Sequence, residues 1–448
     1  MKVHPIPDGS LGNTSYLLEI GGTSAVAIDP RRDVDVYEEA ADRLGLRLES
    51  VVETHLHADF VSGNMELAAA GASIVVPAGA ESTFPHRGIS EGETLDLGGV
   101  RLRALETPGH TPEHLAYVVE GDDGVVGVFS GGSLIAGGAA RTDLIDPALT
   151  EQLTRDQFAS LRRVAELPDA AHLWPTHGGG SFCSAIPASA GATTIGAERA
   201  TNPLLAITDE EEFVREVLNG YGSFPAYFLH LRVINQRGAT LLADLPLPRA
   251  VPAGEVAGLM EDGVWLIDVR SVDEWAAGHP RGAIAIAERP AFASWLGWVI
   301  PFGAPVVFLG DEQAVASATV AARGIGYDDV RGWVDGGLDG WTAAGLPVDS
   351  VESLSPADAL RRVENGSSLV DVRARSEVAV ATIPGAAQIE VGDIAAGKQP
   401  GVDDLITYCA HGERAATAAS LLEHRGLRVA TLAGGFPAWD EAGLPVQR

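Results

Sequence analysis

The C-terminal half of this 448-residue chain contains an internal repeat, which constrains the fold more than any other feature of the sequence. The segment GGLDGWTAAGLPV at 336–348 recurs as GGFPAWDEAGLPV at 434–446. Further upstream, LIDVR at 266–270 matches LVDVR at 369–373. Because two copies of one pattern indicate two copies of one folding unit, we predict two related domains in this half of the chain.

The two predicted domains, at residues 251–350 and 351–448, each contain short apolar runs that alternate with amphipathic stretches. The runs and stretches are 264–269, 305–309 and 313–323 in the first copy, and 368–372, 405–408 and 413–425 in the second. Alternation of strands and helices is typical of a parallel sheet covered by helices. We therefore predict a parallel-sheet α/β fold for both copies.

The N-terminal portion, residues 1–184, is rich in predicted strands. Two strand-like runs separated by Gly21 and Gly22 indicate a β-hairpin. The other predicted elements are a helix at 34–44 and strands at 48–52, 73–76, 100–106, 116–119 and 125–129, which together predict an α/β sandwich. We expect the next segment, 185–250, to be an accessory or linker segment that packs on the sandwich, and the sequence does not indicate its function.

Charge and cysteine content exclude several classes of partner and location. The 31 Lys and Arg residues stand against 61 Asp and Glu residues, a net charge of -30, and such a surface repels nucleic acid and anionic membranes. Residues 1–16 lack an apolar signal-peptide core, and the uncharged stretch 291–310 is broken by Pro301, Gly303 and Pro305. Two cysteines are too few for a disulfide scaffold. We therefore expect a cytoplasmic protein with no nucleic-acid or membrane partner.

Histidines gather in three short motifs that follow predicted strands or lie in turns. The motif THLHADF at 54–60 places two imidazoles and a carboxylate on one loop. Imidazoles two residues apart on an extended loop can converge on one ion. Two further histidines lie in the motifs TPGHT and WPTH. The sequence therefore predicts a metal site, whose candidate residues are His55, His57, Asp59, His110 and His177.

These motifs resemble those of the metallo-β-lactamase superfamily, whose mark is His-x-His-x-Asp-His followed by distant His, Asp and His ligands. The motif TPGHT at 107–111 resembles the glyoxalase II and persulfide dioxygenase branch, and the two C-terminal copies resemble rhodanese domains. The whole chain is similar to bacterial persulfide dioxygenase–rhodanese fusions. The resemblance implies an α/β protein with an αββα metallo-β-lactamase-like sandwich followed by two rhodanese-like parallel-sheet domains. It also implies one mononuclear Fe(II) and a thiol persulfide that O₂ oxidises to sulfite.

The sequence departs from the family pattern at two positions. Phe60 stands where the superfamily motif ends in a histidine, which disfavours a two-metal thioester hydrolase. The turn SGGS at 130–133 stands where the family has Thr-Gly-Asp, so Gly132 replaces a carboxylate ligand. The resemblance implies an iron held by two histidines and that aspartate. His55 and His110 therefore carry over, whereas the facial triad for iron lacks its carboxylate.

Three outcomes stay open for the metal site. In the first, His57 joins His55 and His110 in a three-histidine site, which suits Zn²⁺ or a weakened iron site. In the second, another carboxylate, Asp59 or Asp143, supplies the missing ligand. In the third, the pocket is degenerate and holds no metal.

Three further residues belong near this site by resemblance. Arg141 and Asp143 match the Arg-Thr-Asp that follows the carboxylate turn in the family. His177 matches the last family histidine, and we expect it to line the pocket without binding metal. We expect Cys183 to be a structural, partly buried thiol.

The second C-terminal copy contains a cysteine loop between the predicted strand at 405–408 and the helix that follows. Its residues are Cys409, Ala410, His411, Gly412, Glu413 and Arg414. Inward-facing N–H groups and the helix N-terminus form an anion nest in such a loop, which favours a thiolate. Cys409 is therefore the predicted nucleophile toward sulfane sulfur, and the nest would stabilise its persulfide. Gly412 permits the tight turn, and Arg414 holds the loop or binds an anionic donor such as thiosulfate.

The first C-terminal copy lacks this chemistry. Gly310 stands at the position equivalent to Cys409, and Asp311 and Glu312 place acidic groups where an anion would bind. We therefore expect the first copy to be a structural or docking domain.

The sequence thus favours an enzyme of sulfane-sulfur metabolism, in which thiol persulfide oxidation is coupled to rhodanese sulfur transfer through a Cys409 persulfide. Its expected partners are a small thiol persulfide, thiosulfate or sulfite, and a homo-oligomer is left open. Two alternatives are a glyoxalase II-like thioester hydrolase and a non-catalytic sulfur-binding or scaffold protein with a degenerate metal site.

Overall fold

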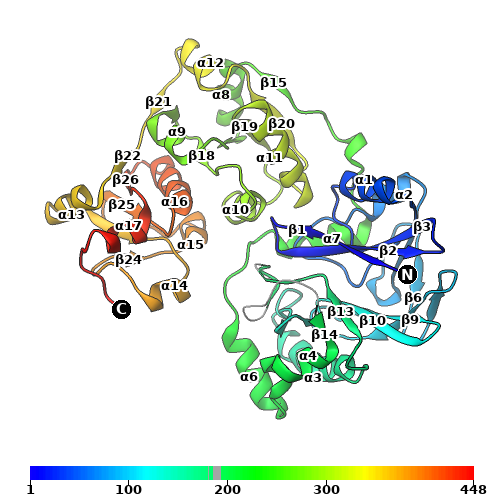
Figure 1. The fold of residues 1–448 in the computed structure, drawn as a ribbon. Coiled ribbons are helices and arrows are strands. Elements are labelled where there is room, and N and C mark those ends of the chain that lie inside the picture. Colours follow the sequence, from blue (N-terminus) through cyan, green and yellow to red (C-terminus); the bar gives the residue numbers. More distant parts are fainter. Residues whose placement is uncertain (180, 185–192) are drawn as a thin grey trace. The chain divides into compact units, whose positions relative to one another are not determined.

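The computed structural model describes residues 1–179, 181–184 and 193–448, and this part of the chain forms two compact units (Figure 1). The first unit contains Met1–Leu245 and Arg323–Gly326, and the second contains Pro246–Ala322 and Tyr327–Arg448. Residues 185–192, the first part of the predicted accessory segment, lie outside the described residues, as does Gly180.

Two mixed sheets form the centre of the first unit. The first sheet has the order β1 (Val3–Asp8), β2 (Asn13–Ile20), β3 (Ser24–Ile28), β4 (Arg47–Val52), β5 (Ser73–Pro77) and β6 (Arg87–Ile89). The second has the order β14 (Thr193–Thr194), β13 (His172–Pro175), β10 (Gly124–Gly131), β9 (Leu115–Gly121), β8 (Arg101–Glu106) and β7 (Thr94–Asp96). The predicted hairpin is present as the antiparallel pair β2 and β3. Strand β14 joins the accessory segment to the second sheet.

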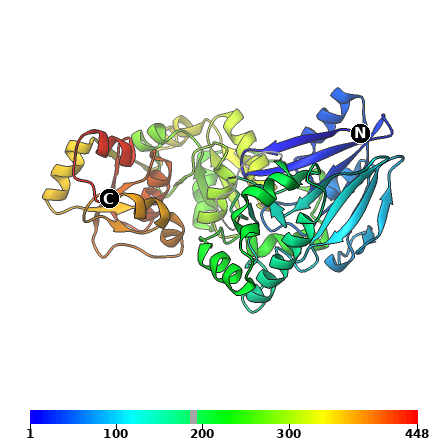
Figure 2. The ribbon, with the colours of Figure 1, turned by 60° about the horizontal axis from the view of Figure 1, so that its bottom comes forward.

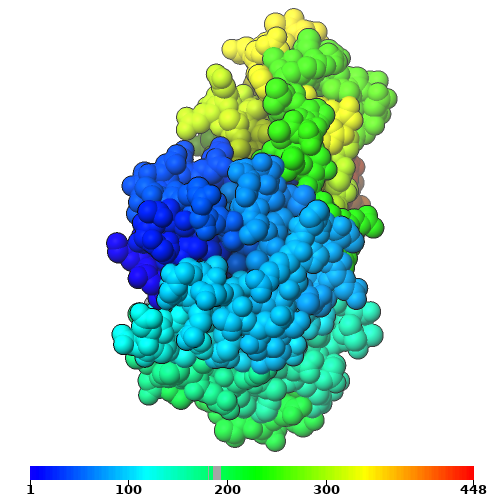
Figure 3. Space-filling view, turned by 90° about the vertical axis from the view of Figure 1, so that its right-hand side faces the viewer, coloured from blue at the N-terminus to red at the C-terminus, as the bar shows by residue number. Residues whose placement is uncertain are grey.

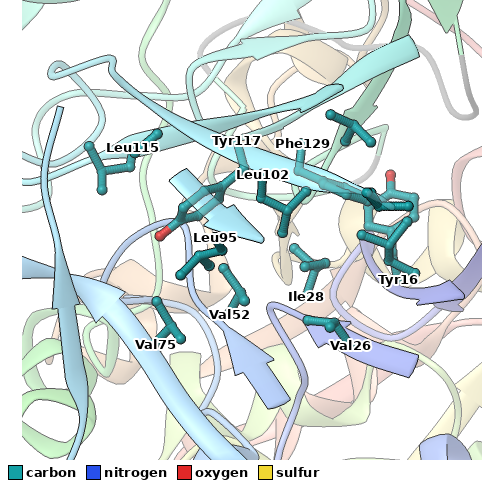
Figure 4. Close-up of a cluster of buried hydrophobic side chains, with 14 of the residues drawn as sticks. Tyr16, Val26, Ile28, Val52, Val75, Leu95, Leu102, Leu115, Tyr117 and Phe129 are labelled. Atoms are coloured by element: carbon teal, nitrogen blue, oxygen red, sulfur yellow. The ribbon is translucent and has the colours of Figure 1, made fainter. Parts of the chain in front are cut away.

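The two sheets pack face to face around an apolar core. Because successive side chains of a strand point to opposite faces, Tyr16, Val26 and Ile28 of the first sheet all face inward. They meet Tyr117 and Phe129 of the second sheet in one buried cluster (Figure 4). Burial of this cluster fixes the register of both sheets, since a shift of one residue would expose the apolar face.

Helices cover the outer faces of both sheets (Figures 1 and 2). Helices α1 (Asp35–Leu44) and α2 (Asn64–Ala69) pack on the first sheet through Tyr37, Ala40 and Leu67. Helices α3 (Thr150–Ala165), α4 (Ile195–Thr201) and α6 (Glu210–Gly220) pack on the second sheet. In the space-filling view, the blue and cyan N-terminal residues form one continuous surface (Figure 3). The predicted αββα sandwich is therefore confirmed.

Shorter elements complete the first unit. They are β11 (Leu134–Ile135), β12 (Gly138–Ala139), α5 (Pro203–Ala206), α7 (Phe228–Arg237) and the 3-10 turns η1 (Ala78–Ala80) and η2 (Leu242–Asp244). The accessory segment thus contributes helices α4 to α7 to this unit.

The second unit contains two parallel sheets with the same strand order. The first is β15 (Arg249–Val251), β20 (Val330–Val334), β19 (Val306–Leu309), β16 (Trp265–Asp268) and β18 (Ile284–Ala285). The other is β22 (Glu352–Leu354), β26 (Arg428–Leu432), β25 (Asp404–Tyr408), β23 (Ser368–Asp371) and β24 (Ala387–Gln388). The short pair β17 (His279–Pro280) and β21 (Val348–Asp349) is antiparallel. The predicted duplication and its parallel sheets are therefore confirmed.

Equivalent helices cover the two sheets. The first copy has α8 (Ala253–Glu261), α9 (Val272–Ala277), α10 (Phe292–Val299), α11 (Glu312–Gly324) and α12 (Gly337–Ala343). The second has α13 (Pro356–Glu364), α14 (Arg375–Val380), α15 (Val391–Ala395), α16 (Glu413–His424) and α17 (Gly435–Glu441).

The repeated C-terminal motif forms the same contact in both copies. The indole N–H of Trp341 donates to the Pro347 carbonyl at 2.9 Å, and that of Trp439 donates to the Pro445 carbonyl at 2.9 Å. Both rings are buried in the cores of their copies. The sequence repeat therefore preserves the same buried tryptophan and the same hydrogen bond in each copy.

The uncharged stretch 291–310 folds into the short helix α10 and the buried strand β19, as its proline and glycine residues predict. Within the described residues, no helix combines the length and the apolarity that crossing a bilayer requires.

Helix α16 of the second copy contacts the first copy through polar side chains. The Thr417 hydroxyl donates to the Ala285 carbonyl at 2.7 Å, and the Ala285 N–H donates to the Ser420 hydroxyl at 3.0 Å. His279 Nε2 lies 3.3 Å from Glu423 Oε2 at the other end of this helix. The first copy therefore holds the helix that follows the cysteine loop.

The His279–Glu423 pair predicts a pH-dependent contribution to the stability of the second unit. Burial lowers the pKa of His279, but hydrogen bonds to Glu423 and the Trp275 carbonyl, with the Asp268 charge, raise it above 6.5. A raised pKa stabilises the fold fully below the unfolded value, and this contribution is lost as pH rises through the folded value. We therefore expect the stability difference between wild type and His279→Gln to be largest in mild acid and to narrow at higher pH.

Urea unfolding followed by tryptophan fluorescence measures this difference, since seven of the eight tryptophans lie in the second unit. Glu423→Gln is the matched control and should flatten the same pH dependence. A difference that stays constant between about pH 5 and pH 8 would contradict the expectation.

Candidate functional site

Three loops of the first unit bring the predicted histidines together. Each loop follows the carboxyl end of a strand: His55 follows β4, His110 follows β8 and His177 follows β13. One ring nitrogen from each of these three histidines lies within 4.8 Å of the other two. All three side chains are buried. The structure therefore gathers His55, His110 and His177, whereas the sequence predicted His57 as the third member.

Hydrogen bonds to the outer ring nitrogens aim the inner nitrogens of His110 and His177 at this point. His110 Nδ1 lies 2.6 Å from the Arg141 carbonyl, and His177 Nδ1 lies 3.0 Å from Asn13 Oδ1. Because a carbonyl oxygen can only accept, both Nδ1 atoms carry the proton. The lone pair of each ring is therefore on Nε2.

The same argument applies to His55 through a relay of two residues. The Thr54 hydroxyl donates to Asp29 Oδ2 at 2.8 Å, so its oxygen accepts from His55 Nδ1, also at 2.8 Å. His55 Nε2 then carries the lone pair, and it lies 3.3 Å from His177 Nε2. The lone pairs of the three histidines therefore point at one another and repel. A cation at their centre would remove this repulsion, because all three nitrogens could bind it.

The buried surroundings keep these three imidazoles neutral. Burial lowers the pKa of His110 to about 3 and that of His177 to about 3. Burial and four neighbouring histidines lower the pKa of His55 well below its ordinary value. Neutral imidazole is the form that binds metal, so the rings are ready to act as ligands at neutral pH.

His57 occupies a different environment in the same cluster. Its Nε2 lies 3.1 Å from Glu53 Oε2 and 3.4 Å from Asp29 Oδ1. Burial lowers the pKa of His57, but these two carboxylates raise it to about 10. The Phe60 ring stacks on the His57 ring with centroids 4.2 Å apart. An apolar ring therefore fills the position where the superfamily motif has its final histidine.

Polar atoms without hydrogen-bond partners show where a metal ion would fit. Among the described residues, His110 Nε2, His57 Nδ1 and Asp59 Oδ1 are buried and have no partner. Buried polar atoms are nearly always satisfied, and unsatisfied ones indicate an ion or water. Two further donor sets, Asp29 with His55 and His57, and His57 with Asp59 and His177, adjoin the first. The residues present therefore fit one divalent cation, and Asp59 offers one unpartnered oxygen beside it while its other oxygen accepts from Asn13 at 2.7 Å.

The Gly131–Gly132 turn is closed to the family carboxylate by the His110 ring. A Cβ atom on Gly132 would overlap that ring. The Gly132 N–H donates to His114 Nε2 at 2.9 Å, and His114 stacks on His55 with centroids 5.0 Å apart. Glycine at this position therefore allows the histidines to pack together.

Arg141 and Asp143 lie beside the cluster and bind each other. Arg141 Nε donates to Asp143 Oδ1 at 2.7 Å, and its Nη2 donates to Oδ2 at 2.8 Å. The guanidinium also lies over the rings of Tyr221 and Phe224. Both oxygens of the Asp143 carboxylate thus accept hydrogen bonds from Arg141. Asp143 belongs to none of the three donor sets among the described residues.

Cys183 is more deeply buried than predicted. Its side chain is fully buried, and burial together with the nearby Asp59 charge raises the pKa of its thiol well above the ordinary value. Its backbone carbonyl accepts from the Arg141 N–H at 2.7 Å.

The sequence reasoning missed several residues that hold the cluster, namely Asn13, Asp29, Glu53, His114 and Gln157. Two of them carried a signal, since Asp29 follows the apolar strand β3 and Glu53 follows the buried pair Val51 and Val52, where a charged residue needs a partner. His114 lies four residues after His110 and could have been grouped with it. Asn13 and Gln157 carried no signal, because only the tertiary fold brings them here.

The cysteine loop lies in the second unit and consists of residues 409–412 between β25 and α16. Cys409 is buried, and its sulfur accepts a hydrogen bond from the Gly412 N–H at 3.1 Å. Gly412 has a φ of 112°, which glycine adopts without strain. The sulfur therefore lies at the N-terminus of a 12-residue helix, in the direction that favours negative charge.

Arg414 lies in the first turn of α16 and pairs with Glu377 of α14. The guanidinium donates to Glu377 at 2.6 and 2.9 Å. Burial lowers the pKa of Arg414, but hydrogen bonds to Glu377 and the Cys409 sulfur raise it above the ordinary value. Arg414 therefore places a fixed positive charge beside Cys409.

The equivalent loop of the first copy is too short for such a site. Only Gly310 and Asp311 separate β19 from α11, against four residues in the second copy. The residue equivalent to Glu377 is Glu274, which caps helix α9 together with Ser271. The first copy therefore has neither the thiol nor the loop.

Comparison with known proteins agrees with this architecture. Residues 8–177 match the metallo-beta-lactamase superfamily, and residues 252–344 and 355–442 each match the rhodanese-like domain. The hydroxyacylglutathione hydrolase of Cupriavidus metallidurans is 30% identical over 257 residues, which cover 50% of this chain and 92% of the relative. That of Methylococcus capsulatus is 36% identical over 169 residues, or 37% of this chain and 62% of the relative.

A solved metallo-beta-lactamase from Staphylococcus aureus is 29% identical, with a TM-score of 0.66, and the match covers 75% of this chain and 98% of that one. The chain spans about three fifths of the length of the first curated relatives that it matches. The sandwich, the histidine cluster and these matches together show that the chain belongs to the metallo-beta-lactamase superfamily and carries two rhodanese-like domains after its N-terminal domain.

Proposed function

We propose that this chain is an enzyme of sulfane-sulfur metabolism that oxidises a thiol persulfide in its first unit and transfers sulfur through a persulfide on Cys409. The observation that carries the proposal is the environment of Cys409. Its sulfur lies at the N-terminus of α16, accepts the Gly412 N–H and has the Arg414 charge beside it. Such surroundings favour the thiolate, which is the nucleophile toward sulfane sulfur.

The transfer step needs only groups of the second unit and a sulfur donor. The Cys409 thiolate attacks the outer sulfur of thiosulfate, the sulfur–sulfur bond breaks, and sulfite leaves with the electron pair. The resulting persulfide carries the negative charge that the Gly412 N–H and Arg414 stabilise. An acceptor thiolate, cyanide or sulfite then takes the outer sulfur and restores the Cys409 thiolate.

In the first unit, His55, His110 and His177 would hold one divalent metal, Fe(II) by family resemblance or Zn²⁺ as the alternative. Bound iron would supply the activation of O₂. The net oxidation converts a thiol persulfide, O₂ and water into the thiol, sulfite and two protons. The chain's own residues orient the ligands: the Arg141 carbonyl, Asn13 and Thr54 each fix one imidazole. Burial of the cluster keeps bulk water from it.

Two assays on the full chain test the two halves separately. The protein loaded with Fe(II) is expected to consume O₂ in the presence of glutathione persulfide and to release sulfite. The same protein is expected to form thiocyanate from thiosulfate and cyanide, whatever the metal content. Absence of O₂ uptake by the iron-loaded protein would overturn the oxidation half, and absence of thiocyanate would overturn the transfer half.

A thioester hydrolase is the second candidate for the first unit. One of the adjoining donor sets favours it. This set contains His57, Asp59 and His177, and it shares His177 with the set of three histidines. The two curated relatives described above are hydroxyacylglutathione hydrolases. This function needs two metals, so binding of two Zn²⁺ per chain together with hydrolysis of an acyl-glutathione thioester would favour it. A chain that binds no metal, and that takes up sulfur on Cys409 without passing it to an acceptor, would instead be a sulfur-binding or scaffold protein without catalysis.

A further inference from the structure

The loop that carries the metal candidates is buried but belongs to no strand or helix. All residues from His55 to Ser62 are buried, and the loop follows β4 directly. Its backbone N–H and C=O groups therefore have no ladder of hydrogen bonds, and each one needs another partner. Helix α7 and the residue before it, in the accessory segment, provide four of these hydrogen bonds, and the Gly324 carbonyl accepts from the Val61 N–H at 2.8 Å.

One side chain of α7 makes three of these hydrogen bonds. The Asn235 amide donates to the His57 carbonyl at 2.8 Å and to the Phe60 carbonyl at 2.9 Å, and its oxygen accepts from the Ser62 N–H at 2.9 Å. Asn235 is 3% exposed, so water does not compete for these bonds. A single carboxamide thus spans the loop from one side of Asp59 to the other.

Two neighbours of Asn235 extend the same contact along the loop. The Tyr227 hydroxyl donates to the Asp59 carbonyl at 2.9 Å. Arg232 binds Glu113 at 2.7 and 3.0 Å, and Glu113 accepts the Leu56 N–H at 3.2 Å. Arg232 and Asn235 are three residues apart on α7 and so lie on one face of the helix.

We propose that Asn235 is a positioning residue of the metal centre, which fixes the loop so that Asp59 Oδ1 faces the convergence point of the imidazoles. Asp59 Oδ1 is buried and unpartnered among the described residues, and Asp59 Oδ2 accepts from Asn13 Nδ2 at 2.7 Å, so the direction of Oδ1 depends on this bond and on the position of the loop backbone. The inference rests on the metal binding contained in the proposed function, and it assigns a role to the accessory segment.

The chain offers a matched control for the test. Asn202 lies in the same accessory segment, is 2% exposed, and donates to the carbonyls of Ile135 and Gly138 at 3.3 and 3.1 Å. These hydrogen bonds of Asn202 do not involve the loop at 55–62. Asn202→Ala therefore removes a buried carboxamide with two backbone carbonyl partners, as Asn235→Ala does, without touching the metal loop.

The experiment measures Co²⁺ binding by the full-length chain, with Co²⁺ as a visible substitute for the native metal. Affinity comes from competition with a chromophoric chelator, and ligand geometry comes from the visible absorption spectrum. We expect Asn235→Ala to lower the Co²⁺ affinity by about 10- to 100-fold, the usual effect of losing an outer partner of a metal site, and to alter the spectrum. Asn202→Ala should lower the thermal midpoint while keeping the wild-type affinity and spectrum.

Each outcome decides the inference. Wild-type affinity and spectrum in Asn235→Ala, or equal losses in both variants, would overturn it. If Asn235→Ala does not fold, Tyr227→Phe replaces it, because this change removes only the hydroxyl that holds the Asp59 carbonyl; an unchanged spectrum and affinity there would equally overturn the inference. Failure of the wild-type chain to bind Co²⁺ would instead overturn the metal binding in the proposed function.

Discussion

Replacement of His110 by alanine is expected to abolish stoichiometric metal binding by the first unit. His110 offers an unpartnered Nε2 to the cluster, and its Nδ1 is fixed by the Arg141 carbonyl. Loss of an outer partner alone costs about 10- to 100-fold in metal affinity, so loss of a ligand should cost more than about 100-fold. Metal analysis of the purified protein after reconstitution and desalting measures the effect. His172→Ala, which alters an exposed histidine on β13, is the control and should retain the metal.

The same measurement distinguishes the triad predicted by the sequence from the triad gathered by the structure. If His55, His110 and His177 are the ligands, His177→Ala should lose metal as completely as His110→Ala, and His57→Ala should retain a measurable fraction. A greater loss of metal from His57→Ala than from His177→Ala would favour the sequence prediction. Wild-type metal content in His110→Ala would contradict both.

Replacement of Cys409 by serine is expected to stop thiocyanate formation from thiosulfate and cyanide. The hydroxyl of serine cannot carry sulfur, and removal of a nucleophile leaves only the small contributions of binding, so we expect a loss of roughly 10³-fold or more. Intact mass after thiosulfate treatment is the direct readout, since wild type should gain one sulfur atom and Cys409→Ser none.

Cys183→Ser is the matched control for this experiment, because Cys183 is the second of the two cysteines. Burial and the Asp59 charge raise the pKa of the Cys183 thiol, so it stays protonated and should gain no sulfur. Sulfur uptake that persists in Cys409→Ser and disappears in Cys183→Ser would refute the assignment of the carrier.

Much of the fold could be predicted from the sequence because its causes are local. Strands β16, β19, β23 and β25 are short apolar runs bounded by turns, and the structure has them within one residue or so of the predicted ranges. The cysteine loop could be predicted for the same reason: the strand, the loop and the helix N-terminus that act on Cys409 adjoin one another along the chain.

The candidate metal site could be predicted only in part. The motifs identified His55, His57, His110 and His177 as candidates, but the choice of ring nitrogen depends on Thr54, Asn13 and the Arg141 carbonyl. A histidine is equally able to present either nitrogen, so its partner decides. No spacing in the sequence shows which partner each ring meets.

The order of the elements, the duplication of the rhodanese-like domain and the survival of its thiol in one copy follow from the sequence alone, because these depend on residues close together in the chain. Only the tertiary structure shows that ring nitrogens of His177, His55 and His110 lie within 4.8 Å of one another, and that Asn235 holds the loop that follows His55. Those contacts join segments more than 100 residues apart, and only packing of the two sheets and α7 brings them within hydrogen-bond distance.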